Sequence, residues 1–325
     1  MKALLCRTLT GIDDLRVEQI DAPKPGPNEI LVDVAAAGVN FPDVLLVQGK
    51  YQFKAPPPFV PGFELAGTVR EAGEGVTHLK AGDHVVAIVS HGAFAQQCVV
   101  PAKAALQLQP GTDLALAAAM LFTYATSYHA LKDRAAIQPG ETLLVLGAAG
   151  GVGLAAVDLG KRMGARVIAA ASSEEKLETC RASGADETVN YASEDLREGV
   201  KRLTNDKGVD VVCDPVGGAY SEAAFRSLAW NGRHLVVGFT AGDIPRLALN
   251  LPLLKGSALV GVFLGGLMQK EPQLARENAR QLVDWVATGA IKPYVSKTYP
   301  LERAVEALRE VAERRVRGKA LIVPG

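Results

Sequence analysis

A glycine-rich turn is the segment of this sequence with the clearest chemical meaning. The apolar run Thr142–Leu146 leads into it, and a helical pattern over residues 151–163 follows it. The turn and the helix start contain Gly147, Gly150, Gly151, Val152 and Gly153. Glycine lets the backbone approach a pyrophosphate closely, and the first N–H groups of a helix bind it with help from the helix dipole. Because strand, turn and helix occur together, the segment predicts a dinucleotide site and not a glycine turn without a ligand.

The polar residues after the second strand indicate which dinucleotide binds. The strand Arg166–Ala171 is followed by Ser172 and Ser173, with Lys176 one helical turn further along. Hydroxyl and ammonium groups suit a 2′-phosphate, whereas folds that bind NAD place a carboxylate at this point. Glu174 and Glu175 follow Ser173, and their negative charges would disfavour a 2′-phosphate. Alternatively, they only stabilise the first turn of the next helix. The pattern favours NADPH.

The elements around these residues predict an α/β fold in two domains. Short strands separated by glycine and proline fill residues 1–120, and the chain after residue 265 is expected to return to this β-rich domain and complete it with residues 266–325. Residues 121–265 alternate between apolar strands and helices, which is typical of a doubly wound parallel sheet. The strands of that sheet are expected at residues 142–146, 166–171, 187–189, 209–213, 233–237 and 258–263.

Composition narrows the class of protein. The 325 residues are 48% apolar and 22% charged, which excludes a disordered, collagen-like or coiled-coil chain. The 35 basic residues balance the 35 acidic ones, which argues against a nucleic-acid partner. The four cysteines have no short spacing, so they encode neither a zinc knuckle nor a redox pair and suit a reducing compartment. With no run resembling a signal peptide or a spanning helix, we expect a cytoplasmic protein with no membrane association.

Several separated motifs support one family. They are Gly38-Val-Asn40-Phe-Pro-Asp43, Pro61-Gly-Phe63-Glu64-Leu-Ala-Gly67, the glycine turn, Asp214-Pro-Val-Gly-Gly218 and Gly318-Lys319. In this order they resemble the zinc-independent quinone oxidoreductases, the ζ-crystallin-like branch of the medium-chain dehydrogenase/reductase superfamily. The resemblance implies a GroES-like catalytic domain, a Rossmann domain, NADPH in the cleft between them and commonly a homodimer. Zinc-dependent relatives carry a histidine where this chain has Phe63, which cannot ligate a metal, so we expect none.

The resemblance also implies roles for individual residues. Asn40 and Asp43 would lie at the floor of the active cleft, with Tyr51 at the substrate mouth. The implied cofactor contacts are Thr126 at the nicotinamide ribose or carboxamide, Gly150, Gly151 and Val152 at the pyrophosphate, Ser172, Lys176 and Tyr191 at the 2′-phosphate end, and Phe239, Phe263, Leu264, Gly265 and Lys319 along the cofactor.

Each of these residues also has a purely structural interpretation. Asn40 could cap a turn and Asp43 the helix that follows it, while Tyr51 could be a surface aromatic. Thr126 could bond its own helix backbone, Tyr191 could pack on its neighbours, and Lys319 could be a solvated charge.

The function that these features predict is the NADPH-dependent reduction of quinones or other α,β-unsaturated carbonyl compounds. The proton donor is left open between water, Tyr51 and His129. The alternatives are an enoyl thioester reductase acting on acyl-CoA and a nucleotide-binding, crystallin-like protein with little turnover. The apolar run from Ala258 to Phe263 would be the last strand of the sheet, and pairing of this edge with a second copy predicts a homodimer.

Overall fold

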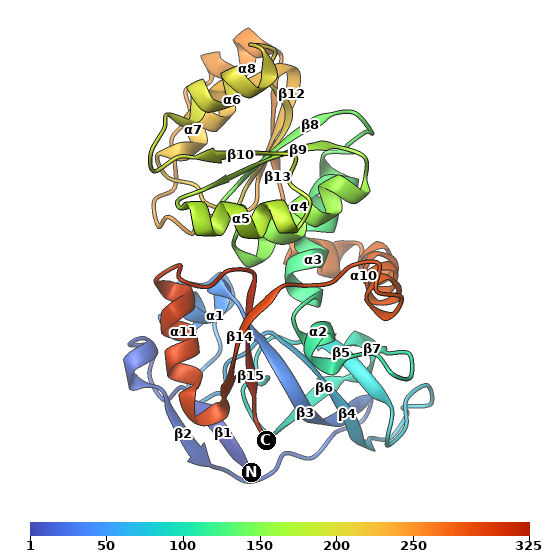
Figure 1. Cartoon of the computed structure of the whole chain (residues 1–325). Helices are drawn as coiled ribbons and strands as arrows, with labels where there is room; N and C mark the ends of the chain where they lie inside the picture. Colours follow the sequence, from blue (N-terminus) through green and yellow to red (C-terminus); the bar gives the residue numbers. More distant parts are fainter. The chain divides into compact units, whose positions relative to one another are not determined.

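The computed structural model describes residues 1–325 and divides into two compact units. Unit 1 comprises Met1–Phe122 and Ala279–Gly325, so the end of the chain belongs with its beginning. Unit 2 comprises Thr123–Asn278. Figure 1 shows the mostly antiparallel sheet of unit 1, in which β14 and β15 form the one parallel pair, and the parallel sheet of unit 2, where β8, β9, β10, β12 and β13 are labelled. The predicted α/β fold with a β-rich domain and a parallel-sheet domain is confirmed.

Unit 1 is built around a seven-stranded sheet whose long central strand is β3 (Glu29–Val39). β3 pairs antiparallel with β4 (Glu64–Ala72), β6 (Gln97–Pro101) and the last strand of the chain, β15 (Lys319–Val323). The remaining strands of this sheet are β5 (His84–Ile88), β7 (Ala105–Gln107) and β14 (Val295–Pro300). A separate two-stranded sheet joins β1 (Lys2–Leu5) and β2 (Arg16–Gln19). The helices that lie wholly within unit 1 are α1 (Phe41–Val47), α2 (Leu114–Ala118) and α11 (Ala304–Ala312).

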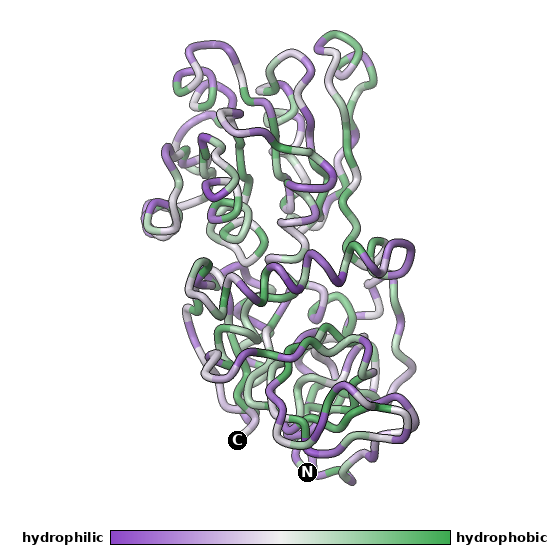
Figure 2. Tube along the Cα trace, turned by 90° about the vertical axis from the view of Figure 1, so that its right-hand side faces the viewer, coloured by the Kyte–Doolittle hydropathy of each residue, from purple (hydrophilic) through white to green (hydrophobic).

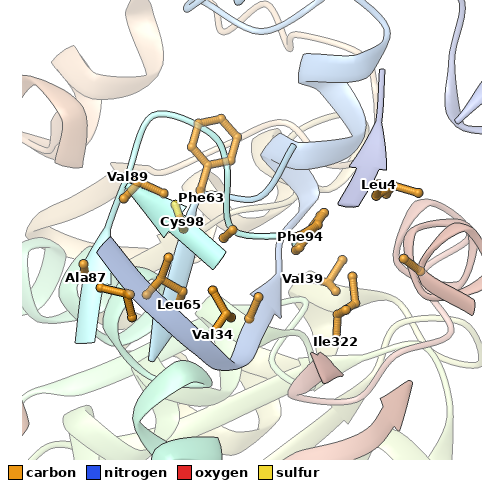
Figure 3. Packing of buried hydrophobic residues seen from close by; sticks show 14 of the residues in the cluster. Leu4, Val34, Val39, Phe63, Leu65, Ala87, Val89, Phe94, Cys98 and Ile322 are labelled. Carbon is orange, nitrogen blue, oxygen red and sulfur yellow. The ribbon is translucent and has the colours of Figure 1, made fainter. Parts of the chain in front are cut away.

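The core of unit 1 joins residues that are far apart in the sequence. Figure 3 shows Val39 of β3 beside Ile322 of β15, with Leu65 of β4 and Phe94 in the same cluster. Leu65, Phe94 and Ile322 are completely buried. Burying a side chain of this size stabilises the fold by about 1.5–3 kcal/mol relative to leaving it in water. The returning strand therefore contributes directly to the stability of the first part of the chain.

Unit 2 contains a six-stranded parallel sheet in the order β10-β9-β8-β11-β12-β13. The strands are β8 (Thr142–Leu146), β9 (Arg166–Ala171), β10 (Glu187–Asn190), β11 (Val209–Asp214), β12 (Leu228–Val236) and β13 (Ala258–Gly261). Its helices are α4 (Gly151–Arg162), α5 (Glu174–Ala182), α6 (Leu196–Thr204), α7 (Tyr220–Arg226), α8 (Asn250–Lys255) and α9 (Leu264–Lys270). The strand order reverses between β8 and β11, and ligands of doubly wound folds bind at such a reversal. Figure 1 shows α4 and α5 on one face of the sheet and α6, α7 and α8 on the other.

Several element boundaries differ from the prediction. The edge strand predicted over residues 258–263 ends at Gly261, and Phe263 is the N-cap residue of α9, which begins at Leu264. β12 starts at Leu228, before the predicted residue 233, and includes an irregular stretch with Asn231 at φ 61°. The sequence pattern also predicts a helix over residues 126–134, where the structure has the end of α3 (Leu121–Tyr128) followed by a π-helix, His129–Arg134. Single π turns are rare and have no simple periodicity signal in a sequence.

The remaining helix, α10 (Pro272–Ala287), is the longest of the chain. None of the helices combines the length and the apolar character that crossing a bilayer would require. In Figure 2, hydrophobic and hydrophilic residues follow one another in short stretches along the trace. This is the pattern expected of strands and helices that bury one face.

Candidate functional site

The glycine-rich turn connects β8 to α4 and is closely packed. Gly147 has φ +55°, a left-handed conformation that favours glycine. A Cβ at Gly153 would lie 2.3 Å from the Gly147 carbonyl oxygen, so α4 can pack against the turn only with glycine at this position. No side chain caps the start of α4, where Gly150 is the N-cap residue. The first N–H groups of a helix have no partner within it, so this turn can bind a phosphate group.

The tip of β9 carries the hydroxyl and ammonium groups that the sequence singled out. Lys176 Nζ donates a hydrogen bond to Ser172 Oγ at 3.2 Å. Ser173 caps α5, its Oγ accepting from the Lys176 backbone N–H at 3.4 Å. Glu174, in the first turn of α5, forms an ion pair with Arg181 of the same helix. Its charge is therefore compensated within α5, which agrees with a helix-stabilising role for this glutamate.

The other residues predicted to contact a cofactor in unit 2 lie in several elements. Tyr191, just after β10, packs on Tyr220 with ring centroids 4.4 Å apart. Thr126 is buried in α3. Phe263 is half-exposed, and its ring packs over the first turn of α9. A Cβ at Gly265 would lie 3.0 Å from the Phe263 ring, so glycine at this position makes the packing possible. Buried Leu264 belongs to the same turn, and Phe239 follows β12 with its ring partly exposed.

Unit 1 contains a buried ion pair between Lys319 and Glu64. Lys319 Nζ lies 2.5 Å from Glu64 Oε1 and also donates to Asn40 Oδ1 at 2.7 Å and to the Val39 carbonyl oxygen at 3.2 Å. The Asn40 amide donates to Glu64 Oε1 at 2.9 Å, and Glu64 Oε2 accepts from the Phe122 backbone N–H at 2.8 Å. Lys319, Glu64 and Asn40 are each at most 5% exposed. We call these three residues the buried triad; it ties β15, β4 and the end of β3 together.

Asp43 lies beside the buried triad and carries an unusual carboxyl group. It is completely buried, and its Oδ2 accepts from the Asn40 backbone N–H at 2.7 Å. Burial raises the pKa of Asp43 to about 8, although the Asn40 amide, the Lys319 charge and the nearby Gly62 amide all favour the ionised form. Oδ1 has no hydrogen-bond partner. The carboxyl group of Asp43 is therefore mostly protonated at neutral pH.

Tyr51 packs edge-to-face on Phe63, with ring centroids 5.3 Å apart. Burial, together with the charge of Asp43, raises the pKa of the Tyr51 phenol above its ordinary value. The structure thus groups Asn40, Asp43, Tyr51 and Lys319, four of the residues predicted from the sequence, in unit 1. Because Lys319 is buried and paired, its interpretation as a solvated charge is wrong.

Glu64 was not predicted as a site residue. It follows Phe63 in the Pro61–Gly67 motif, which served to identify the family and to exclude a zinc ligand at Phe63. Its partner Lys319 is 255 residues away, so no spacing could reveal the pair. A charged residue directly before the short uncharged run of residues 65–67 is the one local signal, because such a charge needs a partner when it is buried.

The remaining candidate proton donor, His129, is hydrogen-bonded within unit 2. Its Nδ1 lies 2.8 Å from Asp133 Oδ2, and the Asn278 amide donates to the same carboxylate oxygen at 2.7 Å. His129 is therefore hydrogen-bonded to a neighbour one helical turn away. No group of three or more His, Cys, Asp or Glu side chains is arranged to hold a metal ion, and Phe63 lies in the hydrophobic core.

Two family models match the chain. Residues 26–110 match the alcohol dehydrogenase GroES-like domain, and residues 151–288 match the zinc-binding dehydrogenase family. The mouse (Mus musculus) quinone oxidoreductase-like protein 2 is 38% identical over 99% of this chain and 91% of its own length.

Two solved structures are similar over the full length of the chain. The Escherichia coli quinone oxidoreductase complexed with NADPH superposes with a TM-score of 0.92 at 31% identity, covering 100% of both chains. A probable oxidoreductase from Mycobacterium abscessus gives a TM-score of 0.90 at 38% identity, covering 100% of this chain and 99% of the other.

Breaking the buried triad is expected to destabilise the protein strongly. Lys319→Met leaves the Glu64 carboxylate buried without its cation, which costs about 3–5 kcal/mol of unfolding free energy. Adding Glu64→Gln removes the uncompensated charge and should recover part of this loss. Urea denaturation measures both changes. Lys2→Met, which breaks the exposed 2.7 Å pair with Glu302, is the control and should cost less than about 1 kcal/mol. Equal losses for Lys319→Met and Lys2→Met would contradict the interpretation of the buried pair.

Asp43 predicts a pH dependence of stability. Its pKa is about 8 in the folded protein and about 4 in an unfolded chain, so the folded state binds the proton more tightly. The contribution of Asp43 to the free energy of unfolding is therefore largest below about pH 4 and is lost as the pH rises towards 8. Urea denaturation should show the wild-type protein losing more stability than Asp43→Asn between about pH 5 and about pH 8. Asp21→Asn, at an exposed aspartate, should follow the wild type, and parallel losses in all three proteins would exclude the raised pKa.

Proposed function

Because the chain belongs to the quinone oxidoreductase-like branch of the medium-chain dehydrogenase/reductase superfamily, we propose that it uses NADPH to reduce quinones or other α,β-unsaturated carbonyl compounds. The observation that carries this proposal is the combination of an uncapped helix start after the glycine turn with Ser172 and Lys176 at the tip of β9. The similar Escherichia coli quinone oxidoreductase, whose structure was determined with NADPH, supports the same cofactor.

The residues of unit 2 fit a phosphorylated dinucleotide. The backbone N–H groups of Gly150, Gly151 and Val152 would hold the pyrophosphate at the start of α4. Ser172 and Lys176 would bind the 2′-phosphate through charge-assisted hydrogen bonds, with Ser173 and Tyr191 beside them. Further contacts are proposed for Thr126, Phe239, Phe263, Leu264 and Gly265. When bound, NADPH supplies a hydride, and an electrophilic acceptor such as a quinone takes it without a Lewis acid.

Unit 1 supplies the groups that we propose for the acceptor. Its reduction needs a proton in addition to the hydride. The Tyr51 phenol carries one at neutral pH, and the raised pKa of Asp43 lets its carboxyl group carry one as well. Tyr51 is the proposed donor; Asp43 would return the proton to it and recover its own from water. Asn40 is not proposed as a proton donor, because its side-chain amide is already hydrogen-bonded at both ends. Its Oδ1 accepts from Lys319, and its Nδ2 donates to Glu64. It is proposed to fix the backbone at the end of β3, which presents Asp43.

The enoyl thioester alternative has less support. A thioester reductase needs a basic path for the CoA phosphates, and the sequence shows only dispersed basic residues such as Arg226, Arg233 and Arg246. Arg226 pairs with Glu222 at 2.7 Å, and Arg233 pairs with Glu141 at 2.6 Å. These guanidinium groups are therefore already neutralised by carboxylates.

The acceptor class is tested by following NADPH oxidation at constant enzyme concentration. The acceptors are 1,4-benzoquinone, 9,10-phenanthrenequinone, a short enone and crotonyl-CoA. The proposal expects turnover of the quinones or the enone at rates well above the reaction without enzyme. Turnover of crotonyl-CoA alone would assign the protein to the thioester reductases. Binding of NADPH without turnover of any acceptor would favour the crystallin-like alternative.

Lys176 is expected to decide the preference for NADPH. Removing one charge-assisted hydrogen bond to the 2′-phosphate costs about 1.5–3 kcal/mol, which corresponds to a loss of about 10- to 100-fold in kcat/KM. Lys176→Ala should lose this factor with NADPH and change less than about threefold with NADH. Lys207→Ala, at an exposed lysine before β11, is the control. Equal losses with both coenzymes in Lys176→Ala would contradict the proposed contact.

We also propose a homodimer formed through the edge strand β13. Leu259 of β13 is 45% exposed, and Leu253 of the neighbouring α8 is 78% exposed. An exposed apolar edge strand invites pairing, and two copies related by a two-fold axis would extend the sheet.

Sedimentation at micromolar concentration should show a dimer of the wild-type chain. Leu259→Lys should shift it towards monomer, because the substitution places two lysines near the two-fold axis. Val323→Lys, at a partly exposed position of β15 in unit 1, is the control and should remain dimeric. A monomeric wild-type protein would overturn this proposal.

A further inference from the structure

A second buried polar network lies in unit 2, at the carboxyl end of β11. Asp214 is the last residue of that strand and is 2% exposed. Its Oδ2 accepts hydrogen bonds from Ser221 Oγ at 2.6 Å and from His234 Nε2 at 3.2 Å. Ser221 belongs to α7 and His234 to β12, so one carboxylate joins three elements.

The other oxygen of the same carboxylate shapes the loop that follows β11. Asp214 Oδ1 accepts the backbone N–H groups of Val216 and Gly217, both at 2.8 Å. Gly217 and Gly218 have φ values of 70° and 62°, so the loop turns through two left-handed residues. We call residues 214–218 the aspartate loop.

The aspartate loop contacts two segments of the proposed cofactor site. A Cβ at Gly147 would lie 2.7 Å from Val216 Cγ2, so Val216 packs directly on the glycine turn. The Pro215 carbonyl oxygen accepts from the Thr240 N–H at 3.2 Å, and the Val216 carbonyl oxygen accepts from the Ala241 N–H at 2.8 Å. The loop therefore positions both the glycine turn and the segment after Phe239.

The carboxylate is held ionised in this buried position. Burial raises the pKa of Asp214, but the hydrogen bonds from His234, Ser221 and Gly217 outweigh it and lower the pKa below its ordinary value. His234 is 2% exposed, and its Nδ1 has no hydrogen-bond partner. The bond to Asp214 is thus the polar interaction that orients the imidazole. Removing it would leave the ring without this hydrogen bond and leave the Ser221 hydroxyl as the remaining donor to Asp214 Oδ2.

The strand order indicates which half of the dinucleotide the aspartate loop would affect. β8 lies between β9 and β11 in the sheet. The proposed 2′-phosphate contacts, Ser172 and Lys176, are at the tip of β9. A dinucleotide whose pyrophosphate lies at the turn after β8 must extend its other half towards β11 and β12.

We propose that Asp214, Ser221 and His234 are positioning residues that hold the aspartate loop against the glycine turn and so set the affinity for the nicotinamide half of NADPH. This inference rests on the proposed function, because it requires that NADPH binds to unit 2. None of the three side chains is assigned a contact with the acceptor.

The test compares two ligands by titration calorimetry on the full-length protein. NADPH reaches the aspartate loop in this account, whereas adenosine 2′,5′-bisphosphate contains only the end bound near β9. His234→Leu and Ser221→Ala should raise the Kd of NADPH about tenfold or more and change that of the bisphosphate less than about twofold. His234→Gln keeps a donor close to the Nε2 position and should recover most of the NADPH affinity.

A matched control separates positioning from general stability. Thr204 is also buried, and its hydroxyl bonds the Val200 carbonyl oxygen at 2.8 Å and accepts from the Gly208 N–H at 3.1 Å, before the start of β11. Thr204→Val should lower the melting temperature without changing either Kd. If His234→Leu does not fold, the milder Ser221→Ala decides the question.

Three results would overturn the inference. One is an unchanged Kd of NADPH in Ser221→Ala and His234→Leu. Another is a parallel loss of affinity for both ligands, and the third is a failure of His234→Gln to recover binding. If the wild-type protein bound neither ligand, the proposed function would fail together with this inference, whereas wild-type binding that the variants leave unchanged would overturn the inference alone.

Discussion

A buried lysine requires a buried carboxylate, and in unit 1 this requirement joins the last strand of the chain to the first sheet. Lys319 begins β15, and Glu64 begins β4. Neither charge could stay buried without the other. Asn40 completes the triad and carries the backbone amide that binds Asp43, so the site depends on a strand that is far away in the sequence. Gly38 allows the close approach, because a Cβ there would lie 2.3 Å from Glu64 Oε1.

In unit 2 a single buried carboxylate, that of Asp214, likewise needs partners that compensate its charge. Asp214 is buried at the end of a strand, and four hydrogen bonds from its surroundings replace the water that it loses. The two networks therefore have related effects. Each fixes the backbone where a strand ends, and each leaves one buried polar atom without a partner, Oδ1 of Asp43 and Nδ1 of His234. In both units, buried charge orders the loops on which the proposed chemistry depends.

Two central strands of the parallel sheet in unit 2 could be predicted from the sequence to the residue, because they are continuous apolar runs. β8 and β9 have the predicted bounds. The glycine turn was equally clear, since its glycines are required by local geometry. The π-helix was not predictable, because it differs from an α-helix by one hydrogen-bond register. The pair of Glu64 with Lys319 and the bond of His234 to Asp214 depend on contacts between distant segments, which no local pattern records.

The most direct test of the central claim is a calorimetric titration of the wild-type protein with NADPH and with NADH under identical conditions. The account predicts one NADPH site per chain, with a Kd about tenfold or more below that of NADH, because Ser172 and Lys176 bind the 2′-phosphate. Equal affinity for the two coenzymes would contradict the role assigned to the tip of β9. Absence of binding to either would contradict the assignment of the glycine turn as a dinucleotide site.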